Sequence, residues 1–339
     1  MSVEQSTARV STKDRFLGCL LGLGIGDALG MPVEGWSQDE IAARYGWIDS
    51  YLPRIEGDTE TVPAGEFTDA TEVALCHVEA LVSAGGFVDP EAVGRRLMLL
   101  ARGESRRFLD PLTLAAIERM EETDQFQAGV VGDGPPDATI AAQIAPVALM
   151  HALGRLNAEV FTREVLRAGL ITRSHPEALN GALAMAYAIW LLAAEHIPPD
   201  VLIPEVAAFI DEDDVAKRLR LAEALARNGG DRELDLTNLR RLGTDGSVAG
   251  SVAAALYAFA VHPDDFATAV LTAVNAGGDT ATIGAMTGAL AGVHLGATAI
   301  PEPLVEGLAG RAYILVAGPS LYRAAQLRAG RLFQIHRGL

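Results

Sequence analysis

Cysteine and positive charge are both scarce in this sequence. Only two cysteines, Cys19 and Cys76, occur in 339 residues, and both lie in apolar, helix-like surroundings. This excludes a disulfide framework and favours reduced core thiols in a cytoplasmic protein. Lys and Arg number 27 against 44 Asp and Glu, which gives a formal charge of −17. Because a nucleic-acid-binding protein usually has a basic footprint, we expect no nucleic-acid partner.

Long, strongly hydrophobic runs are also missing. The apolar run at residues 16–26 is too short to cross a bilayer and ends at Asp27. The uncharged run at residues 283–300 has borderline length, but its Gly, Ala, Thr and His make it weakly hydrophobic. We therefore expect two buried helices of a soluble protein and no membrane association.

Segments with strand-like alternation are not evident, whereas helical spacing recurs along the chain. Half of the residues are apolar, enough for a substantial core. Segments rich in Ala and Leu are separated by Gly, Pro or Asp clusters. The predicted helices cover residues 16–29, 71–83, 90–100, 140–153, 176–194, 216–226, 248–260, 266–274 and 282–295. This pattern predicts an all-α protein with a single domain over residues 1–339.

Two of these segments have glycine at every fourth position. The positions are 18, 22, 26 and 30 in the first segment, and 284, 288, 292 and 296 in the second. Glycine destabilises a helix interior by roughly 1 kcal/mol relative to alanine. Such a regular series therefore indicates a ridge where another backbone comes close. We expect two tightly packed central helices.

Oxygen-bearing side chains concentrate in three short stretches. They are "GIGDALGMPVEG" with Asp27 and Glu34, "GEFTDATEVAL" with Thr68, Asp69, Thr71 and Glu72, and "GGDTATIG" with Asp279, Thr280 and Thr282. One interpretation is capping: Asp69 with Glu72 would form a capping box, and Asp279 or Thr280 would cap the last glycine-rich helix. The other is a cleft in which carboxylates and hydroxyls bind a hard cation, and helix N-termini bind phosphate.

These stretches, together with "AGLITRSHPEALNGALAMAYAI", resemble the ADP-ribosylglycohydrolase family in order and spacing, most strongly over residues 14–325. The resemblance implies a compact orthogonal multi-helix bundle with two Mg²⁺ or Mn²⁺ ions at the bottom of a cleft. It implies Glu34 as the catalytic glutamate and Thr68, Asp69, Asp279 and Thr282 as metal ligands. Substrate binding is expected to involve Asp27, His175, Gly277 and Gly278.

The sequence departs from the family pattern where the chemistry occurs. The family motifs Thr-Asp-Asp-Thr and Asp-(any)-Asp-Thr each have alanine in place of the second aspartate, at Ala70 and Ala281. The usual Thr-His pair is Thr172-Arg173, and a Met-Arg pair is replaced by Ala142-Gln143. Alanine has no donor atom, so we expect at most one tightly held ion.

Three explanations fit the alanines. The chain is a metal-poor relative that binds without hydrolysing, an enzyme that works with one metal or with water and Glu34 alone, or a variant substituted to trap substrate. The resemblance predicts hydrolysis of an ADP-ribosyl or related N- or O-glycosidic bond on an ADP-ribosylated protein or a small ADP-ribose-like ligand. The alternatives are a non-catalytic ADP-ribose or nucleotide-sugar binder and a structural protein. The aromatic residues Trp36, Tyr45, Trp47 and Tyr51 are candidates for adenine contacts or for packing.

Overall fold

A computed structural model describes residues 10–331 and shows an all-α protein with one small hairpin. The first half contains α1 (Thr12–Gly30), η1 (Met31–Val33), α2 (Gln38–Tyr45), β1 (Arg54–Glu56), β2 (Thr59–Val62), α3 (Asp69–Ser83), α4 (Pro90–Leu100), η2 (Glu104–Phe108), α5 (Pro111–Thr123), α6 (Thr139–Gln143), α7 (Ala145–Leu149) and α8 (Ala158–Gly169). The second half contains α9 (Pro176–Trp190), the π-helical turn η3 (Leu191–Glu195), α10 (Pro199–Phe209), α11 (Asp214–Ala226), α12 (Arg232–Leu242), α13 (Val248–Val261), α14 (Phe266–Asn275), α15 (Thr280–Leu295), η4 (Ala297–Ala299), α16 (Glu302–Gly307) and α17 (Arg311–Arg328). The all-α prediction is confirmed.

The two glycine-rich helices, α1 and α15, pack against each other in the centre of the molecule. The glycines of the two helices pair in opposite order, so the helices are antiparallel: Gly18 faces Gly292, Gly22 faces Gly288 and Gly26 faces Gly284. At each pair, an added Cβ would overlap the backbone carbonyl of the opposite helix. The prediction of two central helices in backbone contact is confirmed. This pairing brings the C-terminal end of α1 to the N-terminal end of α15.

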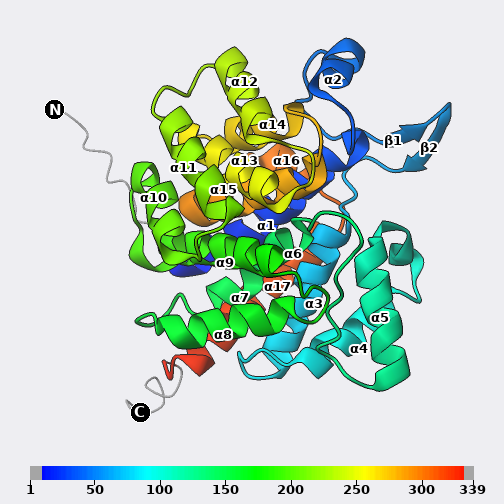
Figure 1. Ribbon diagram of the computed structural model, residues 1–339, viewed down its shortest axis with the longest axis vertical. Coiled ribbons are helices and arrows are strands. Elements are labelled where there is room, and N and C mark those ends of the chain that lie inside the picture. The colour runs from blue at the N-terminus through cyan, green and yellow to red at the C-terminus, as the bar shows by residue number, and fades with distance from the viewer. Residues whose placement is uncertain (1–9, 332–339) are drawn as a thin grey trace.

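Other helices surround this central pair (Figure 1). Helices α13 and α14 pack on α15, and α3 and α17 pack on α1. Farther out, α4 and α5 cover the outer side of α3, and a second apolar cluster including Val73, Leu97 and Ile117 fills that junction. Helix α6, from the middle of the chain, packs against both α3 and α15.

Several predicted boundaries change for local reasons. The predicted helix over residues 140–153 is two short helices, because Pro146 near the start of α7 lacks the N–H that continuous helical bonding requires. The segment ending at residue 194 leaves the α-helix at Trp190 and continues as the π turn η3. The antiparallel β1–β2 pair was not predicted.

In the part of the chain that the structure describes, two helical stretches are long and apolar enough to cross a membrane, Thr12–Val33 and Pro176–Glu195. Most of each stretch is buried inside the fold, which is the position expected of core helices.

Candidate active site

Glu34 joins the segment after α1 to the first turn of α15. Its Oε2 accepts the backbone N–H of Ala281 at 2.7 Å and the hydroxyl of Thr280 at 3.1 Å. The hydroxyl of Thr280 also donates to the carbonyl of Gly30 at 2.8 Å. A carboxylate from another segment therefore satisfies the free amide at this helix N-terminus. Asp279 is the N-cap residue of α15, as the capping interpretation expected, but its side chain accepts no capping bond from the helix.

Asp27 does the same at the start of α3. It is fully buried and accepts four hydrogen bonds, from the backbone N–H and the hydroxyl of both Thr68 and Thr71, at 2.6–3.0 Å. The predicted capping box of Asp69 and Glu72 is wrong, because Thr68 is the N-cap and Glu72 instead accepts the hydroxyl of Ser105. Burial raises the pKa of Asp27 to about 6, although its four donors act in the opposite direction.

Asp279 lies directly beside Glu34, and their carboxyl groups hydrogen-bond to each other. The hydroxyl of Ser251 donates to Asp279 Oδ2 at 2.8 Å, and Thr282 donates a further side-chain bond. Burial is the main cause that raises the pKa of both carboxyl groups, and the charge of Asp279 raises that of Glu34 further. Two close, buried carboxyl groups in this arrangement share a proton at neutral pH.

Asp69, at the first position of α3, has an unusual environment. One of its oxygens, Oδ2, is buried and has no hydrogen-bond partner within the described residues. The backbone N–H of Asp110 donates to the Asp69 side chain. Burial, followed by the charges of Asp110 and Asp27, raises the pKa of Asp69 to about 8. An acceptor left unsatisfied in this way is frequent where a protein meets a ligand.

A buried arginine and two aspartates complete the cluster, and the sequence analysis assigned a role to none of them. Arg173 is 1% exposed. Its guanidinium group donates to Asp110 Oδ1 at 2.7 Å and to both carboxylate oxygens of Asp137 at 3.1–3.2 Å. The only sequence signal was the replacement of histidine by Arg173 in the family motif. Asp110 before Pro111 and Asp137 before a helix are also ordinary capping patterns.

Gly277 and Gly278 shape the backbone at the edge of this cluster. Both have positive φ, +77° and +82°. A Cβ on Gly278 would overlap the carbonyl of Thr244, and one on Gly277 would lie 2.5 Å from the backbone nitrogen of Gln38. Gly278 also exchanges backbone hydrogen bonds with the segment after Glu34, accepting from Gly35 at 2.8 Å and donating to Trp36 at 2.7 Å. Glycine is thus required for close chain approach.

A cavity of about 600 Å³ opens beside these glycines. It is lined by residues adjacent in sequence to Glu34 and Asp279, namely Gly35 and Gly278, together with Trp36, Arg240, Thr244 and Asp245. Trp36 stacks on Tyr45, with ring centroids 6.0 Å apart. The other two aromatic candidates are engaged elsewhere: Arg232 covers the Trp47 ring, and the Tyr51 hydroxyl donates to the carbonyl of Leu304.

His175 lies at the N-cap of α9, where its Nδ1 accepts the backbone N–H of Glu177 at 3.2 Å. This is a capping position, and its predicted contact with substrate stays a prediction.

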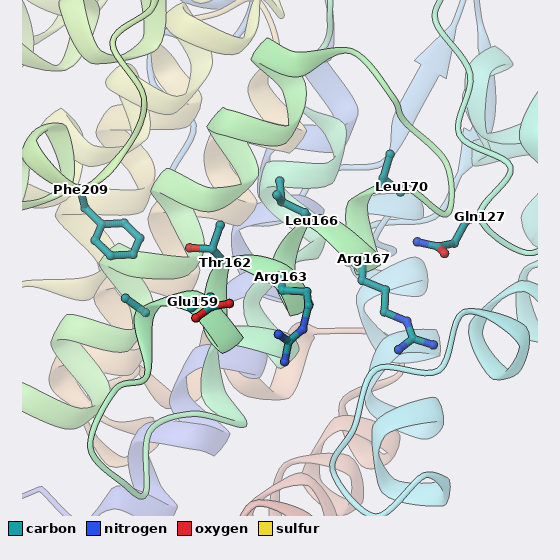
Figure 2. A pocket seen from close by; sticks show the side chains of 9 residues that line it. Gln127, Glu159, Thr162, Arg163, Leu166, Arg167, Leu170 and Phe209 are labelled. Carbon is teal, nitrogen blue, oxygen red and sulfur yellow. The ribbon is translucent and has the colours of Figure 1, made fainter.

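A larger groove of about 770 Å³ runs along α8 and contains none of the predicted site residues. Figure 2 shows its lining, in which Thr162, Arg163, Leu166 and Arg167 project from α8 and Phe209 closes one end.

The donor atoms of the cluster do not fit a two-metal centre. Ala70 and Ala281 carry methyl groups at the two positions where the family motifs have aspartate. Thr68 Oγ1 donates to Asp27 and accepts from Ala70, and Thr282 donates to Asp279. Within residues 10–331, no three His, Cys, Asp or Glu side chains converge as a metal-binding group. We therefore derive no chemical step through a metal ion, and the expectation of at most one tightly held ion stays a prediction.

Comparison with known proteins is consistent with this geometry. The family model described as ADP-ribosylglycohydrolase matches residues 8–331. An uncharacterized protein of Archaeoglobus fulgidus is 31% identical over 91% of this chain and 96% of its own length. The ADP-ribosylarginine hydrolase Tri1 of Pseudomonas putida is 25% identical over 93% of this chain and 80% of its own. A solved structure titled "ADP-ribosylglycohydrolase-related protein complex" superposes with a TM-score of 0.73 at 26% identity, covering 93% of this chain and 99% of that one. The chain therefore belongs to the ADP-ribosylglycohydrolase family.

Proposed function

We propose that this chain binds an ADP-ribosyl group in the cavity beside Gly35 and Gly278 and hydrolyses its glycosidic bond to an acceptor. The observation that carries the proposal is the buried carboxyl pair of Glu34 and Asp279, which hydrogen-bond to each other and whose sequence neighbours Gly35 and Gly278 line that cavity. Family membership supports the bond class, because glycosidic hydrolysis uses carboxyl groups to move protons at an anomeric carbon.

The shared proton defines what the pair does. The hydrogen bond between the two carboxyl groups raises the pKa of Glu34 and lowers that of Asp279, so Glu34 carries the shared proton and donates it to Asp279. The pair then retains one negative charge. The ionised carboxylate of Asp279 accepts a proton from a water molecule that attacks the anomeric carbon. Its negative charge also stabilises the positive charge developing on the ribose ring. The acceptor leaves with the electron pair of the broken bond and takes up the proton that Glu34 held, so the pair again holds one proton after the water has lost its own.

The size, one aromatic residue and one cation of the cavity suit an ADP-ribosyl group, whereas Asp39, Glu40 and Asp245 in its lining oppose a diphosphate. Its volume of about 600 Å³ lies within the usual range of small-molecule sites. Trp36 offers an aromatic face for adenine, and the exposed guanidinium of Arg240, which now donates to Gln38 at 2.6 Å, can bind the diphosphate. The substrate we propose is an ADP-ribosylated arginine of a protein, since Tri1 is named for that acceptor.

The experiment measures free ADP-ribose released from ADP-ribosyl-arginine and ADP-ribosyl-serine peptides, with Mg²⁺, Mn²⁺ or EDTA present. The variants are Glu34→Gln and Asp279→Asn, and the matched control is Glu60→Gln at an exposed hairpin position. We expect release by the unaltered chain and the control, and a loss of about 100-fold or more in each site variant. Equal rates in Glu34→Gln and the unaltered chain would contradict the proposal.

A second function is favoured by one specific observation, the methyl groups of Ala70 and Ala281. A chain that lost catalytic ligands but kept the cavity would bind ADP-ribose without hydrolysing the bond. In that case calorimetry detects ADP-ribose binding, no free ADP-ribose is released by the chain, and the Ala70→Asp/Ala281→Asp double variant gains turnover with Mg²⁺ or Mn²⁺. Turnover by the unaltered chain rules out this alternative.

A further inference from the structure

Two groups of carboxylates meet around Arg173. Asp27, Asp69 and Asp110 form the first group, in which the backbone N–H of Asp110 donates to Asp69. Glu34, Asp279 and Asp137 form the second. Arg173 hydrogen-bonds to one member of each group, Asp110 and Asp137. The guanidinium therefore lies between the two groups.

The position of this guanidinium is fixed. Three of its nitrogens donate: Nη2 to Asp110, Nε to Asp137 and Nη1 to the hydroxyl of Thr113 at 3.2 Å. Asp110 is itself held as the N-cap of α5, accepting two backbone N–H groups at 2.8 and 3.1 Å. The backbone N–H of Arg173 bonds to the carbonyl of Gly169 at 2.9 Å. A planar group held by carboxylates on two sides has little freedom to leave.

The positive charge of Arg173 offsets part of the negative charge of the carboxylates around it. Carboxylates packed this closely repel one another and need a compensating cation. The positions that would add metal ligands are Ala70 and Ala281, and Arg173 is a permanent positive charge in contact with both groups. Unlike a metal ion, a guanidinium cannot be removed by a chelator, and it does not lose its charge at physiological pH.

We propose that the Arg173 guanidinium is the resident cation of these two carboxylate groups, so that in the folded chain they neither need nor bind Mg²⁺ or Mn²⁺. The inference concerns the site of the proposed function, but it does not depend on turnover. Its test measures metal binding and unfolding, so it can fail while hydrolysis is observed, and the reverse is also possible.

The first experiment titrates the full-length chain with Mn²⁺ and measures the electron paramagnetic resonance signal of the free ion. We expect no stoichiometric uptake at submillimolar Mn²⁺, and the same Tm in Mg²⁺, Mn²⁺ and EDTA. Stoichiometric uptake that Asp69→Asn abolishes would overturn the proposal. This experiment uses only the unaltered chain and one variant that keeps Arg173.

The second experiment removes the cation. Arg173→Met leaves the carboxylates uncompensated, and we expect a lower Tm together with a new Mn²⁺-dependent rise of a few degrees. Arg173→Lys keeps the charge, so its Tm does not respond to Mn²⁺. The matched control is Arg328→Met, which breaks an arginine–carboxylate pair with Glu164 (2.7 Å) outside the two carboxylate groups around Arg173. This control is expected to lose stability without gaining a metal response.

A Tm of Arg173→Met that is as insensitive to Mn²⁺ as that of the unaltered chain would refute the idea that the guanidinium takes the place of a metal. If Arg173→Met does not fold, the Mn²⁺ titration of the unaltered chain and the Tm of Arg173→Lys decide the question. A Mn²⁺-dependent Tm in Arg173→Lys would also overturn the proposal, because the charge would then be insufficient.

Discussion

At the scale of single residues, the site is built from carboxylates that cap helices other than their own. Asp27 accepts the free amides of α3, and Glu34 accepts that of α15. Because these two residues satisfy the helix ends, the side chains of Asp69 and Asp279 accept no capping bond from α3 or α15. Pairing helix ends with distant carboxylates leaves several acidic groups buried close together, which destabilises the fold and favours proton transfer.

Because burial raises the pKa of Glu34, the stability of the protein should depend on pH through this residue. Below its ordinary pKa of 4.5 the group is protonated in both the folded and the unfolded states and contributes nothing. Between pH 4.5 and about 8 only the unfolded state releases the proton, so the free energy of unfolding falls as pH rises. Glu34→Gln, which keeps the acceptor for Ala281, is expected to raise that free energy at pH 8 by up to about 4 kcal/mol.

Urea unfolding at pH 4.5 and pH 8 measures this effect. The variant should match the unaltered chain at the acidic pH and exceed it at the alkaline pH. The matched control is Glu60→Gln, whose carboxylate is exposed. A variant that is less stable than the unaltered chain at pH 8 would show that the buried charge is compensated in the folded state.

Much of this residue-level site could be predicted from the sequence, but not its contacts. Asp27, Glu34, Asp69 and Asp279 were found from their motifs, and the structure brings Glu34 together with Asp279. Capping was assigned to the nearest polar residue, because the sequence shows which residues are neighbours along the chain but not which distant residues are in contact. Arg173 was visible only as a departure from a motif, since its partners Asp110 and Asp137 are 63 and 36 residues away.

At the scale of elements, the α1–α15 contact fixes the geometry of the site. The glycines let the two backbones touch, and the antiparallel pairing brings Gly30 against Thr280 at the end that carries Glu34. The four-residue spacing predicted this contact correctly, because each glycine series defines one helix face. Helices such as α8 and α10 were missed, and Pro204 inside α10 helps to explain the second omission.

Gly22→Ala or Gly288→Ala should destabilise the protein strongly. Alanine improves helix propensity by about 1 kcal/mol at such a position. Here the added Cβ of either variant would overlap the carbonyl of the facing glycine, so the helices must separate, at a cost of about 3 kcal/mol or more. The net change is a loss of roughly 2 kcal/mol or more in the free energy of unfolding, measured by chemical denaturation.

Gly154→Ala provides the comparison, because a Cβ there meets no atom within 4 Å. Its free energy of unfolding should stay within about 0.5 kcal/mol of the unaltered chain. If Gly22→Ala were as harmless as this surface change, the backbone contact between α1 and α15 would not be rigid.

At the scale of the whole molecule, the formal charge of −17 opposes an anionic ligand. The diphosphate of ADP-ribose is repelled at long range, and salt screens that repulsion. We therefore expect the Kd for ADP-ribose to decrease when the ionic strength is raised from about 10 mM to about 150 mM. Isothermal titration at the two salt concentrations measures this change.

The opposite trend, weaker binding at higher salt, would mean that local cations such as Arg240 outweigh the net charge. Arg240→Gln distinguishes the two contributions, because it removes a cation from the cavity while changing the total charge by only one unit. The variant should bind more weakly at both salt concentrations and keep the same direction of salt dependence.

The overall architecture was predictable because helical periodicity is a strong signal in segments rich in Ala and Leu. Breaks within those segments were less predictable. The division of residues 140–153 at Pro146 and the π turn after Trp190 depend on how each segment packs against its neighbours. The short hairpin of β1 and β2 lacks the alternation and length that would identify it.

The pairing of α1 with α15 also has a consequence for how the chain is made. About 260 residues separate Gly22 from Gly288, so a ribosome synthesising roughly 5–20 residues per second needs at least ten seconds to supply the partner of α1. During that interval the apolar N-terminal helix is exposed to chaperones and to other nascent chains. Asp279 is synthesised at the end of the same interval, so a product terminated before that residue lacks the carboxyl pair. The synthesis of α15 thus sets the earliest moment at which the carboxyl pair can form.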